Sequence, residues 1–180
     1  MRHRIINTCT GPFALMENDR GEITTMWVTP SIRKTLKASR LEPTLHADLA
    51  RRLRAYFNGD ARVRFDDVET PAGSEFFQRC WDACRRIPRG QTRSYAELAA
   101  MAGSGSSAAR AAGQAMRNNP LPIIVPCHRV VASSGRLHGF AGSCAPDSPE
   151  LSIKNTLLEL EGAAVGKSRS AHRQRVLAIH

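Results

Sequence analysis

Residues 94–116 read SYAELAAMAGSGSSAARAAGQAM and predict two short helices on either side of a glycine-containing turn. The expected first helix covers residues 94–101, the turn residues 102–105 and the second helix residues 106–116. Two helices joined in this way have the pattern of a helix-turn-helix. The second helix is mostly alanine and glycine, which suits a close approach to a DNA groove and suits close helix packing equally well. Arg110 is the one long charged side chain near its start.

A candidate nucleophile follows this stretch. Cys127 lies in the segment PCHRVV, residues 126–131, directly after the apolar run 121–125. A thiol is nucleophilic only as thiolate, and free cysteine titrates near pH ~8.5, so a neighbouring group must draw its proton away. The adjacent imidazole of His128 and a basic surround supply that pull, and the flanking prolines stiffen the loop.

The remaining segments alternate between strand and helix patterns. Hydrophobic periodicity and turn residues predict the following elements: a β-hairpin over residues 5–29 with its turn at 18–21, a helix over 44–57, a short strand over 62–68, a helix over 74–86 capped by Ser74, and a last helix over 150–160. The segment Thr-Pro-Ala-Gly at residues 70–73 marks a boundary. We therefore expect an N-terminal α/β domain over 1–70, a mainly helical domain over 71–164, and a basic, mobile tail over 165–180.

The composition limits the class of protein and its partners. With 180 residues, 42% of them hydrophobic, the chain can bury a core as one domain or two small ones. Lys and Arg number 26 against 16 Asp and Glu, a net charge of +10, which favours nucleic acid first and an anionic membrane surface second. The five cysteines are dispersed and odd in number, which indicates free thiols in a reducing compartment. No membrane span or secretion signal is apparent, so we expect a cytoplasmic, nucleoid-associated protein.

Several ordered blocks together resemble the O6-alkylguanine-DNA alkyltransferase family, the methylated-DNA–protein-cysteine methyltransferases. The similarity covers roughly residues 45–162. It is carried by the blocks FFQRCW (76–81), IPRGQTRSY (87–95), ARAAGQAMRNNP (109–120), IVPCHRVV (124–131), GFAG (139–142) and LLELEG (157–162). Ordered blocks at family-like spacings are far more specific than one short motif.

The resemblance implies a fold and a function. The fold class is α+β, with a small RNase H-like N-terminal α/β domain and a mainly helical C-terminal domain that contains a helix-turn-helix. The function is direct-reversal DNA repair, in which an alkyl group passes irreversibly from O6-alkylguanine in duplex DNA to Cys127, with O4-alkylthymine as a second candidate substrate. The protein would act once, as a monomer, without metal or cofactor, because a thioether is a poor leaving group.

The resemblance also implies roles for individual catalytic residues. Cys127 is the alkyl acceptor, and His128 acts as base through a bridging water. Glu161 orients that imidazole, which is the logic of nucleophile, base and orienter on another fold. Asn119 holds the strained stretch before the active loop. Tyr95 crowds the backbone phosphate and donates a hydrogen bond to guanine N3.

A second set of residues is expected to bind the flipped base and the DNA. Arg110 fills the gap left by the extruded nucleotide. The Val130 carbonyl reads the guanine amino group, and the Ala141 N–H addresses O6. The apolar pocket walls are Pro122, Met116 and Phe140, and the remaining expected DNA contacts are Ser94, Ala108, Ala109 and Arg117.

Some features depart from the family pattern or allow other interpretations. The segment 143–153 is several residues longer than the usual connection into the last helix, which leaves adduct range and the position of Glu161 open, and Cys144 within it is expected to be incidental. Cys80 and Cys84 with His46 suggest zinc, but a cysteine pair one helical turn apart fits the core better. Arg129 fits either a phosphate contact or a packing salt bridge.

Three other functions fit parts of the sequence. A non-catalytic alkyltransferase-like protein that binds DNA damage would lack the acceptor cysteine, which is present here. A plain helix-turn-helix regulator would not need the Pro-Cys-His-Arg segment. A cysteine hydrolase would require an acyl or phosphoryl site, and the phosphatase arrangement is missing because the position six residues after the cysteine is Ser133 and not arginine.

Overall fold

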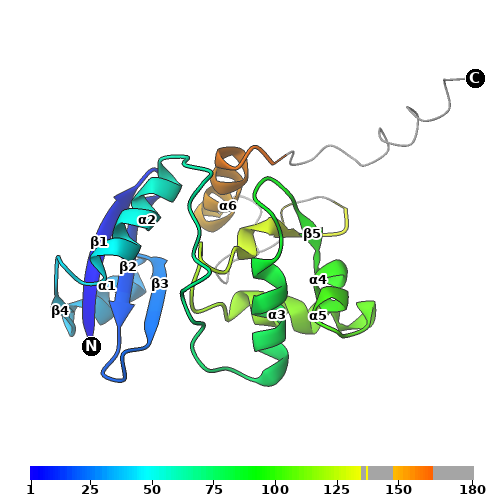
Figure 1. Ribbon diagram of the computed structural model, residues 1–180, viewed down its shortest axis with the longest axis horizontal. Coiled ribbons are helices and arrows are strands. Elements are labelled where there is room, and N and C mark those ends of the chain that lie inside the picture. Colours follow the sequence, from blue (N-terminus) through cyan, green and yellow to red (C-terminus); the bar gives the residue numbers. More distant parts are fainter. Residues whose placement is uncertain (135–136, 138–147, 164–180) are drawn as a thin grey trace, which may run out of the picture.

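The computed structural model describes residues 1–134, 137 and 148–163 (Figure 1). Its first part is a four-stranded sheet in the order β3-β2-β1-β4, in which the first three strands run antiparallel and β4 pairs parallel with β1. The elements are β1 (Arg2–Thr8), β2 (Gly11–Glu17), β3 (Ile23–Trp27), α1 (Pro30–Lys37), β4 (Arg40–Leu41) and α2 (Ala47–Phe57).

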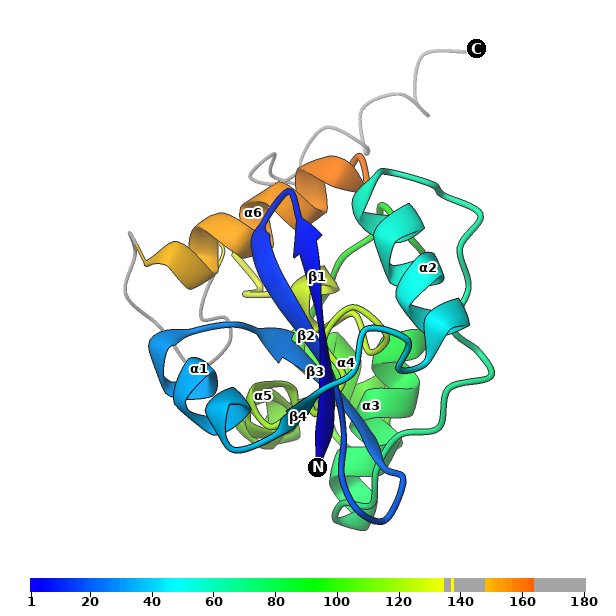
Figure 2. The ribbon, with the colours of Figure 1, turned by 90° about the vertical axis from the view of Figure 1, so that its left-hand side faces the viewer.

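The central strand β2 is buried on both faces. Phe13 and Leu15 belong to the main core, while the alternate residues Ala14 and Met16 form a small cluster with Leu36 of α1. Because successive side chains of a strand point to opposite faces, α1 and the main core lie on opposite sides of the sheet. Figure 2 shows α1 and α2 on the two sides of the strands.

The second part is mainly helical. Its elements are α3 (Glu75–Arg85), β5 (Arg93–Ser94), α4 (Tyr95–Met101), the 3₁₀ turn η1 (Ser106–Ala108), α5 (Ala109–Arg117), the 3₁₀ turn η2 (Cys127–Arg129), β6 (Val130–Val131) and α6 (Pro149–Leu160). Side-chain caps start three of these helices: Ser74 for α3, Ser148 for α6, and Ser94 with Glu97 as a capping box for α4. Strand β5 pairs parallel with β6, which brings the start of α4 next to the segment after Cys127.

The two parts share one core. The main cluster of buried side chains contains Phe13 of β2, Leu53 of α2, Leu98 of α4 and Leu157 of α6. Strand β3 also binds the loop after α5, because Thr25 donates its N–H to the Pro120 carbonyl at 3.0 Å and its hydroxyl to the Pro122 carbonyl at 2.9 Å. The sheet therefore supports the loop that leads to Cys127.

Most of the expected helices and the hairpin turn are confirmed. Asn18 accepts hydrogen bonds at the β2–β3 turn, and helices form within residues 44–57, 74–86, 94–101 and 150–160. The second helix of the 94–116 stretch begins as the 3₁₀ turn η1 and becomes α-helical only at Ala109. Elements α1, β1, β4, β5 and β6 were not expected.

The expected strand over residues 62–68 is wrong. This segment contains no strand, and its backbone carbonyls bind side chains instead of a neighbouring strand. Arg64 binds the carbonyls of Ala61 and Val63, and Arg85 binds those of Phe65 and Val68. The apolar residues Val63, Phe65 and Val68 are spaced by two and then three positions, and they pack an irregular segment against the core.

No helix in the described part of the chain is long and apolar enough to cross a bilayer.

Candidate active site

The loop before Cys127 is strained, and besides Thr25 the side chain of Asn119 holds it. Ile123 has φ +77°, a left-handed conformation that is unfavourable for a β-branched residue. Asn119 spans the strained turn: its Nδ2 donates to the Val125 carbonyl at 2.8 Å, and its Oδ1 accepts from the Leu121 N–H at 2.9 Å. The expected holding role of Asn119 is therefore consistent with its contacts.

Two tight turns then determine the backbone conformation around Cys127. Pro126, at φ −80° and ψ 62°, forms an inverse γ-turn in which the Cys127 N–H donates to the Val125 carbonyl at 2.8 Å. The 3₁₀ turn η2 begins at Cys127, and the Arg129 N–H closes it on the Pro126 carbonyl at 2.9 Å. Cys127 is 8% exposed and therefore belongs to the buried residues.

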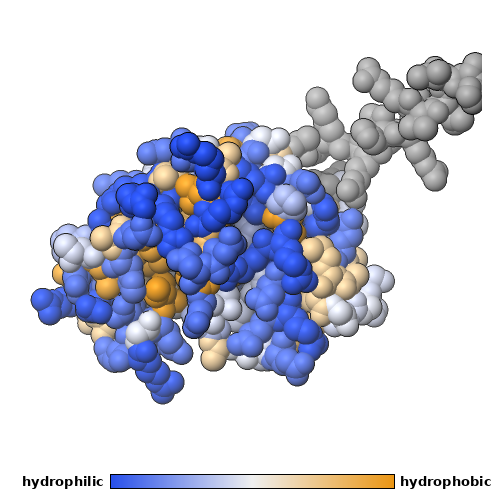
Figure 3. All heavy atoms as spheres, in the orientation of Figure 1, coloured by the Kyte–Doolittle hydropathy of each residue, from blue (hydrophilic) through white to orange (hydrophobic). Residues whose placement is uncertain are grey.

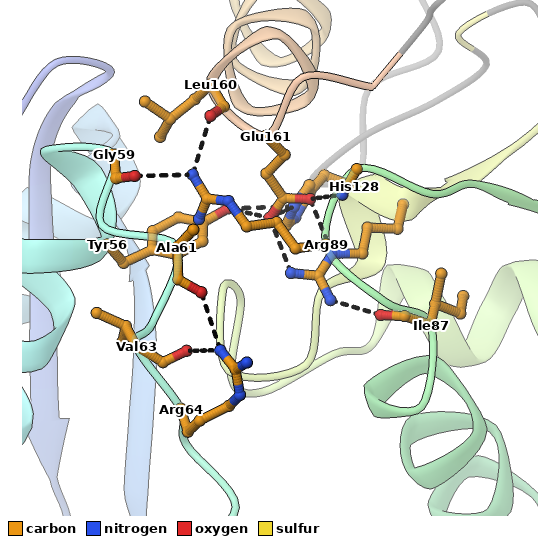
Figure 4. A network of polar contacts seen from close by, with 12 residues as sticks. Tyr56, Gly59, Ala61, Val63, Arg64, Ile87, Arg89, His128, Leu160 and Glu161 are labelled. Carbon is orange, nitrogen blue, oxygen red and sulfur yellow. Dashed lines mark hydrogen bonds and ion pairs between the residues drawn. The ribbon is translucent and has the colours of Figure 1, made fainter.

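Glu161, the residue that caps the C-terminus of α6, is the centre of the polar network (Figure 4). Its Oε1 accepts from His128 Nε2 at 3.0 Å, from the Tyr56 hydroxyl at 2.7 Å and from Arg129 Nη2 at 2.8 Å. Its Oε2 accepts from Arg129 Nε at 2.9 Å and from the Gly90 N–H at 3.4 Å. Burial opposes ionisation of this carboxyl, but the hydrogen bonds from His128 and Arg129 outweigh it and hold its pKa well below the usual range.

Gly90 makes this arrangement possible. It has φ +76°, and a Cβ at this position would lie 3.0 Å from the Glu161 carbonyl oxygen. A side chain here would therefore be strained and would push against the residue that holds His128.

The network determines which nitrogen of His128 is available as a base. Burial lowers the pKa of His128 despite the hydrogen bond and charge of Glu161, so the neutral imidazole is favoured. An ionised carboxylate only accepts hydrogen bonds, so Nε2 must carry the proton that faces Glu161. Nδ1 then holds the lone pair; it is buried and has no hydrogen-bond partner among the described residues.

Two neighbouring groups partly offset the effect of burial on the Cys127 thiol. Burial raises the pKa of the Cys127 thiol, while a hydrogen bond from Asn119 and the charge of Lys154 act in the opposite direction. Lys154 is fully buried on α6 and donates from Nζ to the Val130 carbonyl at 2.6 Å. Burial lowers the pKa of Lys154 to about 8, so it remains mostly charged at neutral pH.

Tyr56 and Lys154 are two residues of this site that the sequence interpretation missed. Tyr56 comes from α2 in the sheet-containing part, and its ring packs under the Arg89 guanidinium at 5.3 Å. Its hydroxyl also lies 3.2 Å from His128 Nε2. Lys154 had a detectable signal, because it stands at helical spacing with the buried residues Leu151 and Leu158.

The expected DNA-contacting residues lie on and around α4 and α5. Arg110 in the first turn of α5 and Arg117 in its last turn are exposed, and Ala108 and Ala109 are half-buried where η1 meets α5. Ser94 caps α4. The Tyr95 ring faces α5, since a Cβ on Gly113 would lie 3.9 Å from it.

The remaining expected residues divide between described and undescribed segments. Met116 is buried and Pro122 is half-buried, and the Val130 carbonyl already accepts the Lys154 hydrogen bond. Phe140, Ala141 and Cys144 lie outside the described residues, as does much of the long 143–153 segment.

The structure also gives the contacts of the residues in two open alternatives. Arg129 forms the packing salt bridge: it holds Glu161 through two nitrogens and donates a third hydrogen bond to the Ile87 carbonyl at 2.6 Å. Cys80 and Cys84 are buried in the main core, and His46 pairs with Glu17.

Comparison with known proteins identifies the family. Residues 75–163 match the family described as 6-O-methylguanine DNA methyltransferase, DNA binding domain. The methylated-DNA–protein-cysteine methyltransferase of Methanosarcina barkeri is 37% identical over 162 residues, which cover 89% of this chain and 97% of that protein. The Mycobacterium tuberculosis protein of the same name is 36% identical over 165 residues, which cover 89% of this chain and 92% of that one.

Solved structures agree with this assignment. The crystal structure of Mycobacterium tuberculosis O6-methylguanine methyltransferase has a TM-score of 0.75 at 35% identity, covering 92% of this chain and 96% of that chain. A structure of Mycobacterium tuberculosis OGT in complex with DNA has a TM-score of 0.74 at 35% identity, covering 90% and 93%. The chain therefore belongs to the methylated-DNA–protein-cysteine methyltransferase family.

Proposed function

We propose that this protein repairs alkylated DNA by moving the alkyl group of O6-alkylguanine from the base to Cys127 Sγ. The observation that carries the proposal is the hydrogen-bonded chain from Glu161 to His128, directly beside Cys127 on one 3₁₀ turn. Family membership supports the same reaction, because the relatives carry this activity in their names.

The proposed reaction is an in-line displacement. His128 Nδ1 takes the thiol proton through one bridging water, and Glu161 stabilises the imidazolium that forms. The Cys127 thiolate attacks the alkyl carbon, the S–C bond forms as the C–O6 bond breaks, and the electron pair of that bond remains on guanine. A hydrogen bond from Tyr95 to guanine N3 helps the base accept this charge. Lys154 favours the thiolate before attack by its positive charge.

The product limits the protein to one turnover. A thioether sulfur is a poor leaving group, and each protein molecule is therefore consumed by one lesion. The chemistry places the alkyl donor in the DNA, so the reaction takes no metal and no cofactor.

We assign different roles to the two parts of the fold. We infer an N-terminal, RNase H-like domain over residues 1–70 and a catalytic and DNA-binding domain over 71–164. Helices α4 and α5, joined through the turn at 102–105 and η1, act as the helix-turn-helix, with α5 facing the DNA groove. Arg110 takes the place of the flipped nucleotide, while Met116, Pro122, Phe140 and the backbone of Val130 and Ala141 surround the base.

A non-catalytic role in damage binding is the second candidate function. Such a protein needs only the helix-turn-helix and the base pocket, and the acceptor thiol argues against it. The protein is expected to act as a monomer on duplex DNA.

Transfer assays with matched duplexes test the proposal. Label on the methyl group of O6-methylguanine in a duplex should move to the protein with one label per molecule, and label on O4-methylthymine should move more slowly or not at all. Tight binding to the O6-methylguanine duplex without transfer of label would instead establish the damage-binding function.

A further inference from the structure

A second candidate site is a cavity next to the Cys127 loop that the thiol itself does not line. It has a volume of about 360 Å³, and Pro126 lines it while Cys127 does not. Its cationic lining consists of Arg64, Arg85, Arg89 and Arg129. These arginines come from the 61–66 segment, from α3 and its C-terminal loop, and from η2, so distant parts of the chain contribute to one site.

Three of the four arginines form no salt bridge with a carboxylate among the described residues. Arg129 is neutralised by Glu161, but Arg64, Arg85 and Arg89 donate to backbone carbonyls. A carbonyl orients a guanidinium without neutralising it. Asp66 is the one carboxylate in the cavity lining. The lining therefore carries a positive excess, and a low-dielectric wall focuses such a field on an anion.

Two of these guanidinium groups have hydrogen-bond donors to spare. Arg64 uses only Nη1, which binds the carbonyls of Ala61 and Val63, each at 2.9 Å. Arg89 uses only Nη2, which binds the Leu160 carbonyl at 2.9 Å and the Gly59 carbonyl at 3.4 Å. Within the described part of the chain, the other guanidinium nitrogens of both residues have no acceptor. Figure 4 shows the two side chains reaching this region from different segments.

The remaining wall is apolar. Apart from Tyr56, it is formed by apolar residues, namely Ala61, Val63, Phe65, Ile87, Pro88, Ile123, Ile124 and Pro126. A volume of this size is typical of a small-molecule site, and arginine forks match the geometry of phosphate oxygens. We propose that this cavity binds a phosphate-bearing anion, with phosphate oxygens held by Arg64 and Arg89 and any organic part against the apolar wall. The phosphate comes either from a small soluble molecule or from a DNA backbone.

Calorimetric titration of the full-length protein with inorganic pyrophosphate tests the site. The test variant is Arg64→Gln, and the control is Arg62→Gln, which removes an equal charge from an exposed residue that pairs with Asp60 and does not line the cavity. We expect saturable binding that weakens about tenfold in Arg64→Gln and less than about twofold in Arg62→Gln. Absence of saturable binding to the unmodified protein, or equal weakening in both variants, would overturn the proposal.

The source of the phosphate is resolved by adding undamaged duplex DNA. If the ligand is a backbone phosphate, duplex DNA should displace pyrophosphate, and Arg64→Gln should weaken DNA binding more than Arg62→Gln does. If it is a small molecule, pyrophosphate should bind equally well to the protein saturated with DNA. Cys127→Ala should bind pyrophosphate like the unmodified protein, so failure of the anion site and failure of alkyl transfer are separate results.

Discussion

At the residue scale, Tyr56 connects the sheet-containing part of the molecule to the catalytic network. Its hydroxyl donates to Glu161 Oε1, the same oxygen that accepts from His128 Nε2. Burial and then the charge of Glu161 raise the pKa of this hydroxyl well above its ordinary value. Tyr56 is therefore a hydrogen-bond donor over the whole neutral range, and it helps to fix the orientation of His128.

Replacing Tyr56 by Phe removes this donor and keeps the ring. We expect the transfer rate to fall about tenfold and the free energy of unfolding to fall by about 1–3 kcal/mol, because a buried carboxylate loses one partner. Glu161 becomes more basic, so the pKa of His128 should rise and the low-pH inflection of the rate should move to higher pH. Single-turnover rates between pH 5 and 8 measure the transfer rate and the position of its low-pH inflection.

A packing control separates positioning from stability. Phe57→Leu changes the neighbouring core ring on α2, which packs edge-on against Tyr56 at 5.5 Å but forms no side-chain hydrogen bond to Glu161 or His128, and it should lower stability with an unchanged inflection. An unchanged rate and inflection in Tyr56→Phe would show that its hydroxyl has no role in positioning His128.

The sequence could predict the part of the site that is close together along the chain. Cys127 and His128 are adjacent, and the block 157–162 suggested Glu161 by resemblance. Tyr56 was out of reach, because 72 residues separate it from His128 and 105 from Glu161. Such a contact depends on how α2 packs against the second part, which local periodicity does not encode.

At the scale of elements, α6 buries apolar side chains together with two charged ones, Lys154 and the capping residue Glu161. Leu151, Lys154, Leu158 and Glu161 follow one another at intervals of three or four residues, and all four are buried. The helix therefore brings a cation and an anion into the core beside η2. This arrangement costs stability at Lys154, because burial lowers the pKa of its ammonium group from 10.5 to about 8.

Lys154→Met should raise the stability of the protein and lower the rate of alkyl transfer. At pH 7 the ammonium group is charged in both folded and unfolded states, so removing it should raise the free energy of unfolding by about 1–3 kcal/mol. Between pH 8 and 10.5 the unfolded chain binds more protons, so the stability of the unmodified protein should rise and the difference should shrink. Transfer should slow, since the Cys127 thiolate loses a nearby positive charge.

Urea unfolding of both proteins at pH 7 and at pH 10 measures the difference. Lys34→Met on α1 is the control, because this exposed lysine should leave stability and transfer unchanged. Equal destabilisation of Lys154→Met at both pH values would contradict the cost assigned to the buried charge.

The helix α5 carries the prediction for nucleotide flipping. Arg110→Ala should slow transfer from duplex DNA at least about tenfold, because the unstacked gap loses the side chain that fills it. Transfer from free O6-benzylguanine needs no flipping and should change less than about twofold. Arg51→Ala on α2 also removes an exposed positive charge and should affect neither reaction. Equal slowing of both reactions by Arg110→Ala would remove its proposed role.

The predictability of the elements follows from their length. The helices over 74–86 and 150–160 were expected because three or more turns display a period, and the first of them also begins with a capping serine, Ser74. Strands β4, β5 and β6 have two residues each, too few to show any alternation. The segment 62–68 has strand-like residues but its carbonyls bind arginine side chains, which a pattern of apolar residues cannot reveal.

At the scale of the whole molecule, the positive charge supports the DNA-binding function. The chain carries a net charge of +10, and the face in Figure 3 is covered mainly by hydrophilic side chains. Affinity for undamaged duplex DNA should fall by two to three orders of magnitude between 50 and 200 mM salt if about five phosphates are contacted. Fluorescence anisotropy at several salt concentrations measures the slope. A flat dependence would separate the charge from DNA binding.

The most direct test of the central claim is the intact mass of the protein after incubation with excess O6-methylguanine duplex, followed by peptide mapping. The account predicts a gain of one CH₂ per molecule, located on Cys127, retained by Cys9→Ala and absent from Cys127→Ala. Cys9 is the informative control because it is an exposed free thiol. Methylation of Cys9 or another residue, or further gain of mass in Cys127→Ala, would contradict the assignment of Cys127 as the activated acceptor.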